Sequence, residues 1–328
     1  MQIFHHIEEI NLAGPTYLTI GNFDGLHRGH QALIEQMQAE AKRDGHADAC
    51  TALMTFEPHP VLFFRPDTPL HLLTTPRERI ELAANLGIDV GIIQPFDQQT
   101  AALSARDFMQ MLVSHVGLYC LVVGPDFALG RKREGTIDVL RSLGDELGYR
   151  VVVIEPVHAS DEEVRSFNIR RHLYEGDVVH AQRLLGRVYT VSGVVVDGDK
   201  RGRTIGVPTA NLDIPSARIL PADGVYATWA WIGRPGESKP YGSATNIGVR
   251  PTVDGTQRRV EAHLFDFPPP GESGDLYGQT LTVGFVARLR GEQRFNGLDE
   301  LVAQIQRDLH AAREILANQN PGESVPHQ

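Results

Sequence analysis

The sequence contains few cysteines and tryptophans, two of each in 328 residues. Cys50 and Cys120 both lie in apolar, strand-like segments, so we expect buried free thiols, not a disulfide or metal ligands. No apolar run is long enough to cross a bilayer, and the first residues lack the charged and apolar regions of a signal peptide. The sequence therefore predicts a cytoplasmic protein without membrane spans.

An excess of positive charge is also missing, since the formal net charge is −10. A protein that coats nucleic acid normally presents a basic face to the phosphate backbone, so this class is disfavoured. Local basic clusters remain that can bind small phosphates: Arg131–Arg133, Arg170 with Arg171, and Lys200 with Arg201 and Arg203. Each cluster taken alone is more typical of a solvated surface.

The length allows two domains, and the pattern of the first half alternates strands with helices. Such alternation predicts an α/β, doubly wound (Rossmann-like) domain with a parallel sheet, in which ligands bind at the carboxyl ends of the strands. The expected strands are Thr51–Phe56, Val90–Ile93, Tyr119–Val123 and Val151–Ile154, and the expected helices are Pro76–Leu86, Ala105–His115 and Ile137–Leu147.

The second half changes its period and predicts an antiparallel β-barrel followed by a C-terminal helix. In the last expected strand, Leu281–Leu289, apolar residues alternate with others, which indicates a half-buried strand. We place the boundary near Arg187, giving domains 1–186 and 187–328, with a helical connection from Ser166 to Leu185. The other expected strands are Tyr189–Val196, Val225–Trp231 and Val260–Phe267.

Residues 21–30, Gly-Asn-Phe-Asp-Gly-Leu-His-Arg-Gly-His, lie between an apolar strand and a helix. The N-terminus of a helix offers free N–H groups and a positive dipole end to phosphate, and Gly29 permits a close approach. His27 and His30 share one helix face. A metal site or two surface histidines are the alternatives. The pattern resembles the nucleotidyltransferase superfamily, and class I aminoacyl-tRNA synthetases carry a related motif, so the acceptor stays open.

The second half contains Gly206-Val-Pro-Thr-Ala-Asn-Leu212. On an extended backbone, Thr209 and Asn211 point the same way, and their oxygens suit Mg²⁺ together with phosphate oxygens. The preceding loop, residues 198–203, is glycine-rich and cationic. A hairpin with solvated basic residues is an equally good interpretation.

These two motifs together resemble the bifunctional bacterial FAD synthetases. Further blocks agree in order: Thr55–Pro60, Val122–Phe127, Leu220–Tyr226, Thr245–Thr252 and Asp275–Gly278. The resemblance implies a nucleotidyltransferase domain followed by a riboflavin kinase barrel. It implies an enzyme that phosphorylates riboflavin to FMN with ATP and Mg²⁺, and then adenylylates FMN to FAD with a second ATP. A riboflavin kinase whose front domain only binds nucleotide is the alternative.

For the barrel, the resemblance implies that Thr209 and Asn211 bind magnesium and that Glu261 is the general base. Arg290 and Arg294 match flavin-contacting positions. The alternatives are an ion pair of Glu261 with Arg258 or Arg259, and solvated arginines. Phosphate contacts are expected from the loop cations Lys200, Arg201 and Arg203.

For the front domain, the resemblance assigns His27 and His30 to stabilisation of the leaving pyrophosphate. Asp126 lies in a block associated with flavin or adenine contacts. One block departs from the family: Arg165-Ser-Phe167 stands where relatives read Ser-Ser-Thr, although Ser166 and Arg170 keep their register. Arg165 adds charge where two hydroxyls are lost. The remaining expected nucleotide-binding residues are Gly21, Asn22, Asp24 and Gly29.

Overall fold

The computed structural model describes residues 1–12, 14–46, 48–159, 161–198, 202, 205–252, 255–268, 275–319 and 321, with only the backbone between 250 and 257. The chain divides into two compact units, Met1–Ser166 and Phe167–Gln328, each described by itself below. The helical connection that was predicted from Ser166 to Leu185 packs mainly with the second unit. The functional boundary near Arg187 stays a prediction. The loop cations Lys200, Arg201 and Arg203 lie outside the described residues.

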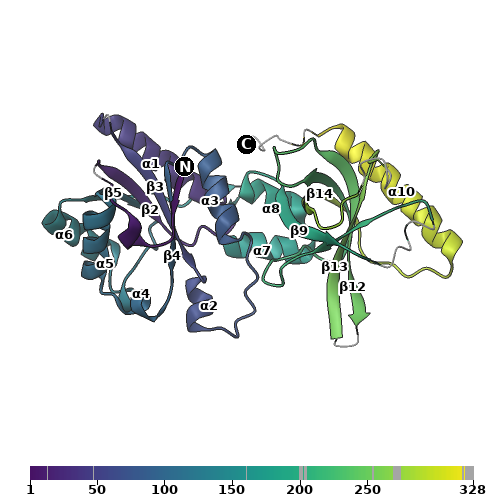
Figure 1. Cartoon of the computed structure of the whole chain (residues 1–328), viewed down its shortest axis with the longest axis horizontal. Helices are drawn as coiled ribbons and strands as arrows, with labels where there is room; N and C mark the ends of the chain where they lie inside the picture. Colours follow the sequence, from purple (N-terminus) through teal and green to yellow (C-terminus); the bar gives the residue numbers. More distant parts are fainter. Residues whose placement is uncertain are drawn as a thin grey trace. The chain divides into compact units, whose positions relative to one another are not determined.

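The first unit is built on a six-stranded sheet, which confirms the predicted parallel architecture. All pairs in this sheet are parallel, and the order is β1-β4-β3-β2-β5-β6. Figure 1 labels β2, β3, β4 and β5 of this sheet. Its strands are β1 (Gln2–Phe4), β2 (Thr16–Ile20), β3 (Cys50–Glu57), β4 (Val90–Pro95), β5 (Leu118–Val123) and β6 (Arg150–Val153). A short antiparallel pair follows, β7 (His158–Ala159) with β8 (Glu162–Glu163).

Helices cover both faces of this sheet. One core cluster includes residues of α1 and α3, and the other includes residues of α5 and α6. The chain is therefore wound on both sides of the sheet, as the alternating pattern predicted. The helices are α1 (Arg28–Asp44), α2 (Pro60–Phe64), α3 (Pro76–Asn85), α4 (Gln98–Ala102), α5 (Ala105–Met111) and α6 (Ile137–Leu147), with short turns η1 (Ile7–Glu9), η2 (Leu112–Val116) and η3 (Arg131–Arg133).

Local sequence signals explain where several helices begin. Thr75 forms a capping box with Glu78 ahead of α3, and Ser104 accepts a hydrogen bond from the N–H of Asp107 at the start of α5. The single helix expected over Ala105–His115 instead ends as the π-helical η2. The prediction of free thiols is confirmed, and burial raises the pKa of both to about 11.

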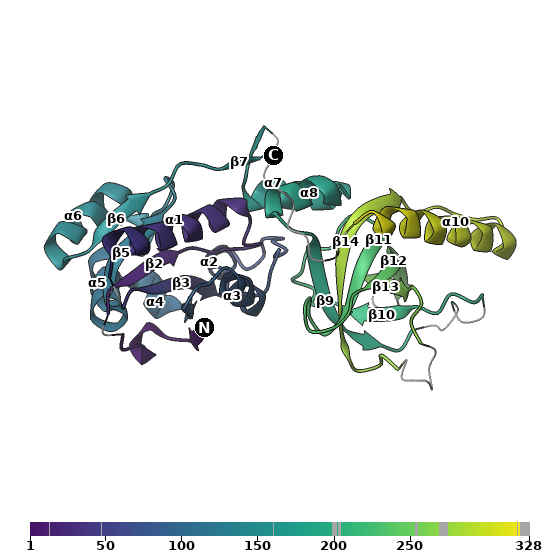
Figure 2. The same ribbon diagram turned by 90° about the horizontal axis from the view of Figure 1, so that it is seen from above.

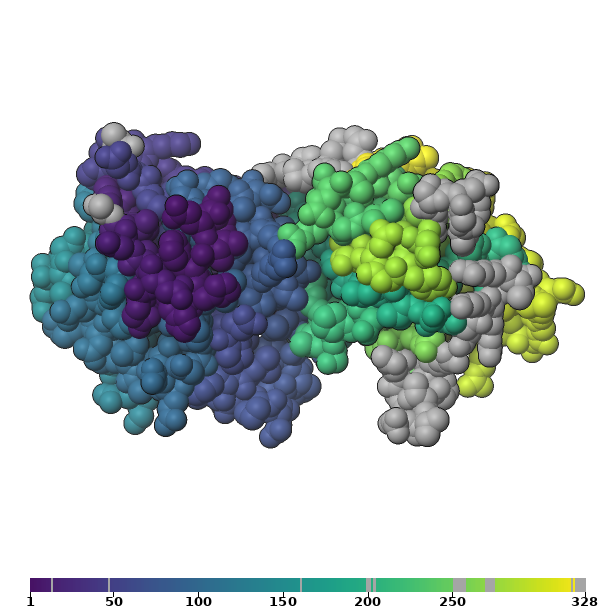
Figure 3. Space-filling model, viewed as in Figure 1, coloured from purple at the N-terminus to yellow at the C-terminus, as the bar shows by residue number. Residues whose placement is uncertain are grey.

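Strand β1 was not expected from the sequence. It pairs with β4 at the edge of the sheet, and Figure 3 shows the N-terminal residues on the surface of the first unit. Its three residues are too few to show a period, because alternation needs a longer run to be recognised.

The second unit begins with two helices and continues into a closed barrel, as predicted (Figure 2). The barrel order is β10-β13-β12-β11-β14-β9, and every pair is antiparallel. The elements are α7 (Ser166–Glu175), α8 (Val178–Leu185), β9 (Tyr189–Val196), β10 (Ala210–Asp213), β11 (Gly224–Ile232), β12 (Tyr241–Thr252), β13 (Gly255–Leu264), β14 (Thr280–Arg290) and α10 (Leu298–Ala317).

The expected alternation of burial along β14 is only partly found. Leu281, Val283 and Phe285 are fully buried, but Thr282 and Val286 on the other face are buried as well. Val286 packs in a cluster with Ala312 and Leu316 of α10. Because this helix covers the outer face of the strand, part of that face is removed from water too, and the half-buried interpretation was wrong there.

An ion pair joins the end of β14 to α10. The guanidinium of Arg290 donates to both carboxylate oxygens of Asp308, from Nε at 3.1 and 3.0 Å and from Nη2 at 2.8 Å. Asp308 is 7% exposed, and its Oδ1 also accepts from Gln304. A forked, mostly buried pair of this kind fixes the helix against the barrel with a defined register.

We expect Asp308→Asn to destabilise the barrel unit by about 2 kcal/mol, because the Arg290 guanidinium loses its charged acceptor while remaining largely buried. Both tryptophans of the chain, Trp229 and Trp231, lie in β11, so tryptophan fluorescence during urea unfolding reports on this unit alone. Glu314→Gln is the control, since Glu314 is 70% exposed and pairs only across one helix turn with His310. Equal midpoints for the two variants would contradict the expectation.

Candidate functional site

The turn between β2 and α1, residues 21–27, lies at the switch point of the parallel sheet. From β2 the chain adds β3 and β4 on one side and β5 and β6 on the other, so the strand order reverses between β2 and β5. In open α/β sheets this is where ligands bind, at the carboxyl ends of the strands. Asp126 follows the carboxyl end of the neighbouring β5, which pairs with β2 in parallel. The fold therefore brings two predicted site segments to one edge.

The two imidazoles of this turn stack on each other. His27 is the N-cap of α1 and His30 lies in its first turn, and their ring centroids are 3.6 Å apart with an interplanar angle of 16°. The rings of His30 and Phe23 are in a T-shaped arrangement, with centroids 5.0 Å apart. The shared face expected from the spacing is thus found. In the described part of the chain no cysteine or carboxylate joins the two imidazoles in a group of three metal-ligand atoms, which leaves the zinc alternative unsupported.

The backbone of the turn is held in an unusual conformation. Phe23 and Leu26 have positive φ angles of 47° and 38°, a region that side chains other than glycine rarely adopt. Both side chains are nearly fully buried. Their burial, together with the contacts of Asp24 described next, offsets a strain of about 1–3 kcal/mol for each such residue.

Asp24 anchors this turn to a segment fifty residues away. Its Oδ1 accepts from the N–H of Thr74 at 2.9 Å, and its Oδ2 accepts from the N–H of Leu73 at 3.1 Å. Gly25 donates from its N–H to the Thr74 hydroxyl at 2.8 Å, and Arg79 lies 3.5 Å from the carboxylate. Asp24 and Arg79 are 2% and 1% exposed. Asp24, which was predicted to contact the nucleotide, is thus a buried residue that fixes the conformation of the turn through these hydrogen bonds.

The other predicted residues near this turn, Asn22, Ser166, Gly21 and Gly29, make different local contacts. Asn22 is exposed and its carbonyl accepts from Thr55 at 3.0 Å. Ser166 donates its hydroxyl to the carbonyl of Asp24 at 2.8 Å, so the altered block is tied directly to the turn. A Cβ at Gly29 would lie 3.3 Å from the His27 ring, and one at Gly21 would lie 3.3 Å from the Phe23 ring. Both glycines let those rings pack closely.

Arg165, which replaces a family hydroxyl, contacts Asp126. Its Nη2 lies 3.2 Å from Asp126 Oδ2 and its Nε lies 2.7 Å from a carboxylate oxygen of Glu163. The hydrogen bond to Glu163, with a smaller contribution from Asp126, holds the pKa of Arg165 above its ordinary value. The guanidinium is 54% exposed, so these pairs contribute little stability. Arg170 lies in α7 within the second unit, and its phosphate contact stays a prediction.

The second group of predicted residues lies on neighbouring barrel strands. Asn211 of β10 is directly opposite Glu261 of β13, and Glu261 is directly opposite Asn246 of β12. Side chains that are opposite one another in an antiparallel pair project from the same face about 5 Å apart. The barrel thus places the predicted metal ligand and the predicted base side by side, with an amide beyond them that the sequence analysis had not singled out.

Glycines let the backbone pass close over this group. A Cβ at Gly198 would collide with the side-chain amide of Asn211, and a Cβ at Gly202 would lie 3.6 Å from the Thr209 hydroxyl. The Asn211 Oδ1 is buried and accepts no hydrogen bond from the described residues. A buried oxygen without a donor is costly, and coordination of a cation would satisfy it. Thr209 and Asn211 therefore fit Mg²⁺ as hard oxygen ligands.

Two side chains of β13 make contacts that the sequence analysis had not singled out, and one of them helps to position this group. His263, two residues after Glu261, contacts the Pro208 carbonyl through Nδ1 at 2.8 Å and so holds the residue before Thr209. Alternation along β13 places His263 on the face of Glu261, a signal that the sequence already contained. Arg258 donates from Nε to Asp223 at 2.8 Å and from Nη1 to the carbonyl of Leu220 at 3.3 Å. Its guanidinium therefore binds the segment that precedes β11.

The two predicted flavin-contacting arginines differ in environment. Arg290 is held by Asp308 as described above, whereas Arg294 is exposed. The flavin contacts of both, like the roles of the other site residues, stay predictions.

We expect Asp24→Asn to destabilise the first unit by about 2–3 kcal/mol, because an amide NH₂ would face backbone donors that now share a carboxylate. Hydrogen exchange at the N–H groups of Leu73 and Thr74 is the direct measurement, and their protection should fall. Asp67→Asn, at an exposed position, is the matched control. Unchanged protection in Asp24→Asn would show that the carboxylate does not hold the turn.

Comparison with known proteins agrees with this division. A family model described as FAD synthetase matches residues 10–168, and one described as riboflavin kinase matches residues 185–316. The chain is 39% identical to the bifunctional riboflavin kinase/FMN adenylyltransferase of Escherichia coli K12 (93% of this chain, 94% of the relative) and 33% identical to that of Bacillus subtilis (96% of each).

A solved structure agrees over nearly the whole chain. This structure, described as a macrolide-efflux protein from Streptococcus pneumoniae, aligns with a TM-score of 0.84 and 30% identity, covering 97% of this chain and 99% of that one. Among the described residues, no helix combines the length and the apolar character needed to span a bilayer. The chain belongs to the family of bifunctional riboflavin kinase/FMN adenylyltransferases.

Proposed function

We propose that this protein phosphorylates riboflavin to FMN with one ATP and adenylylates FMN to FAD with another, releasing pyrophosphate. The observation that carries the proposal is the presence of two separate candidate sites, one in each compact unit, in the order of the two matched family models. The relatives named for both activities are similar over both units. This favours the two-activity interpretation over a riboflavin kinase with an inactive front domain.

In the kinase reaction a hydroxyl of riboflavin attacks the γ-phosphate of ATP and must lose its proton. Glu261 is half-buried on β13 opposite Asn211, where a carboxylate can accept that proton as the phosphoryl group moves. Thr209 and Asn211 hold Mg²⁺, which neutralises charge on the phosphate oxygens. His263 keeps the Thr209 segment in place through Pro208.

In the adenylyl transfer a phosphate oxygen of FMN attacks the α-phosphate of ATP, and pyrophosphate leaves. The N-terminus of α1 presents backbone N–H groups at this point, and the stacked His27 and His30 place imidazole donors beside them. Donors fixed before the reaction stabilise the growing charge of the leaving group without reorganisation. Ser166 adds a phosphate contact in this proposal, and a cytoplasmic location remains a prediction.

His30→Ala should lower the rate of FAD formation from FMN and ATP by about 100-fold or more, because one fixed donor to the leaving group is lost. Formation of FMN from riboflavin and MgATP should stay within about twofold of the parent, because the proposed site of phosphoryl transfer lies in the other unit. Chromatographic separation of FMN and FAD measures both rates in one sample. Loss of both activities in a folded His30→Ala protein would refute the division of labour.

Glu261→Gln should have the opposite profile. The amide cannot accept the hydroxyl proton, so FMN formation should fall by about 100- to 10,000-fold while FAD formation from supplied FMN persists. The pH dependence of the residual kinase rate distinguishes a base from a merely structural carboxylate, since loss of the base removes the acidic limb of the profile. An unchanged limb in the variant would assign the proton acceptor elsewhere.

A further inference from the structure

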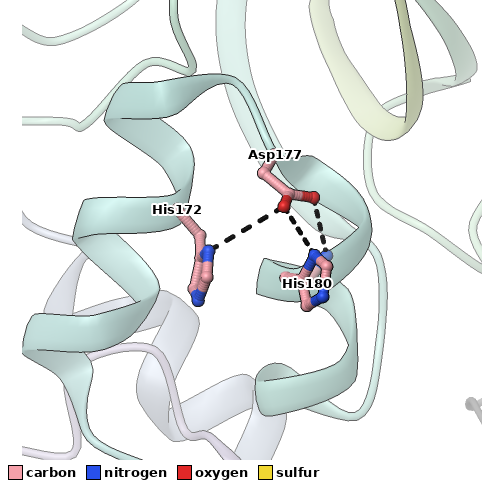
Figure 4. Close-up of side chains that lie close together, drawn as sticks. All are labelled: His172, Asp177 and His180. Carbon is pink, nitrogen blue, oxygen red and sulfur yellow. Dashed lines mark hydrogen bonds and ion pairs between the residues drawn. The ribbon is translucent and has the colours of Figure 1, made fainter. Parts of the chain in front are cut away.

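Three side chains with metal-binding atoms meet where α7 passes into α8 (Figure 4). The Nδ1 of His180 lies 2.5 Å from Oδ2 of Asp177, and the Nδ1 of His172 lies 4.0 Å from the same oxygen. All three atoms lie within 4.8 Å of one another. The imidazole rings are nearly parallel, at 16°, with centroids 5.3 Å apart. This cluster is separate from the residues assigned to either reaction.

The backbone holds the three residues in a fixed arrangement. The α7 helix closes on Gly176, which has a φ of 79° and donates from its N–H to the carbonyl of Leu173 at 3.0 Å. Asp177 donates from its N–H to the carbonyl of His172 at 2.8 Å, which links two of the three residues directly. Because these bonds define the turn, the donor atoms converge without a long loop that would need to be ordered on binding.

The two oxygens of Asp177 have different partners. Oδ1 accepts from the backbone N–H of His180 at 3.1 Å and caps α8, whereas Oδ2 faces the two imidazoles. These hydrogen bonds outweigh the opposing effect of burial and hold the pKa of Asp177 below its ordinary value. One carboxylate oxygen can therefore bind a cation while the other keeps the helix cap and orients the group.

The donor set specifies the class of ion. Two imidazole nitrogens and one carboxylate oxygen are typical ligands of Zn²⁺, at about 2.0–2.2 Å from the ion. Donors around such an ion lie about 3.3 Å apart, and the observed separations of 2.5 and 4.0 Å fall on either side of that value. Mg²⁺ prefers oxygen ligands and is poorly matched here. Small side-chain rotations bring the three atoms to a common ion.

We propose that His172, Asp177 and His180 form a binding site for a borderline divalent transition metal ion, represented by Zn²⁺, which clamps α7 to α8. The His172 side chain is 12% exposed and His180 is 46% exposed, so an ion enters from the His180 side and reaches a sheltered ligand. Arg171 lies 3.4 Å from the other ring nitrogen of His172 and is exposed, so it can turn away as the ion binds. Without an ion, the Asp177–His180 pair acts as a helix cap.

The test uses the full chain with Co²⁺ as a spectroscopic probe and Zn²⁺ as competitor, in an excess of Mg²⁺ that occupies oxygen-rich sites. One equivalent of Co²⁺ should bind with visible absorption bands of a low-coordinate site, and Zn²⁺ should displace it. Asp177→Asn keeps a good helix cap but removes the anionic ligand, and His180→Ala removes an imidazole; each should weaken Co²⁺ binding by about tenfold or more. His310→Ala, an exposed histidine of α10, should bind as the parent does.

A second measurement separates binding from folding damage. Zn²⁺ that binds only the folded protein raises its melting temperature, and this shift should be present in the parent and in His310→Ala but absent in Asp177→Asn. Far-ultraviolet circular dichroism confirms that the variants retain their helices. Co²⁺ binding that is equally strong in all four proteins, or binding too weak to saturate in the parent, would overturn the proposal. Neither readout depends on flavin chemistry.

Discussion

The buried carboxylate of Asp24 is the contact on which the geometry of the first unit depends. A turn with left-handed Phe23 and Leu26 is unfavourable by itself. It persists because both side chains are buried and because Asp24 ties the turn to Leu73 and Thr74. The result is that α1 begins where the sheet reverses its strand order, with its two imidazoles stacked. Buried polar groups that are fully satisfied define one conformation, because leaving any of them unpaired is costly.

The barrel achieves preorganisation in a different way. Its closed register fixes Asn211, Glu261 and Asn246 on adjacent strands, so no long-range anchor like Asp24 is needed. Within this group of side chains, the Oδ1 of Asn211 accepts no hydrogen bond from the described residues, and the backbone at Gly198 lies close over it. In the first unit, strain is held in the backbone of a turn whose buried carboxylate is hydrogen-bonded. In the barrel, the site strands β10, β13 and β12 pair in unbroken register, and the Asn211 Oδ1 has no hydrogen-bond donor among the described residues. Both arrangements exchange some stability for a site that is ready to bind charge.

The sequence was sufficient for the fold class of both units, because the fold class depends on local period. Spacing also predicts which candidate side chains share a face, whereas the roles of those side chains stay predictions. The three-residue separation of His27 and His30 alone implies a common face, and alternation implies that of Thr209 and Asn211. The features that could not be predicted are contacts between residues that lie far apart in the sequence. The residues near Asp24 do not indicate that its carboxylate would accept a hydrogen bond from Thr74. The residues of β14 likewise do not indicate that α10 would cover Val286. Strand pairing likewise decides that Asn246 lies beside Glu261.

The chemistry of the two proposed reactions explains why the two sites carry different groups. A ribityl hydroxyl is a poor nucleophile until its proton is accepted, so the proposed kinase reaction requires a carboxylate beside the predicted metal ligands, and Glu261 lies opposite Asn211. The phosphate of FMN is already anionic near neutral pH and needs no base. Its difficulty is repulsion between anions, which a carboxylate would worsen and a helix N-terminus with imidazole donors relieves. It follows that Asp24 can be tolerated so near the first site only because it is buried beneath the turn and neutralised by Arg79.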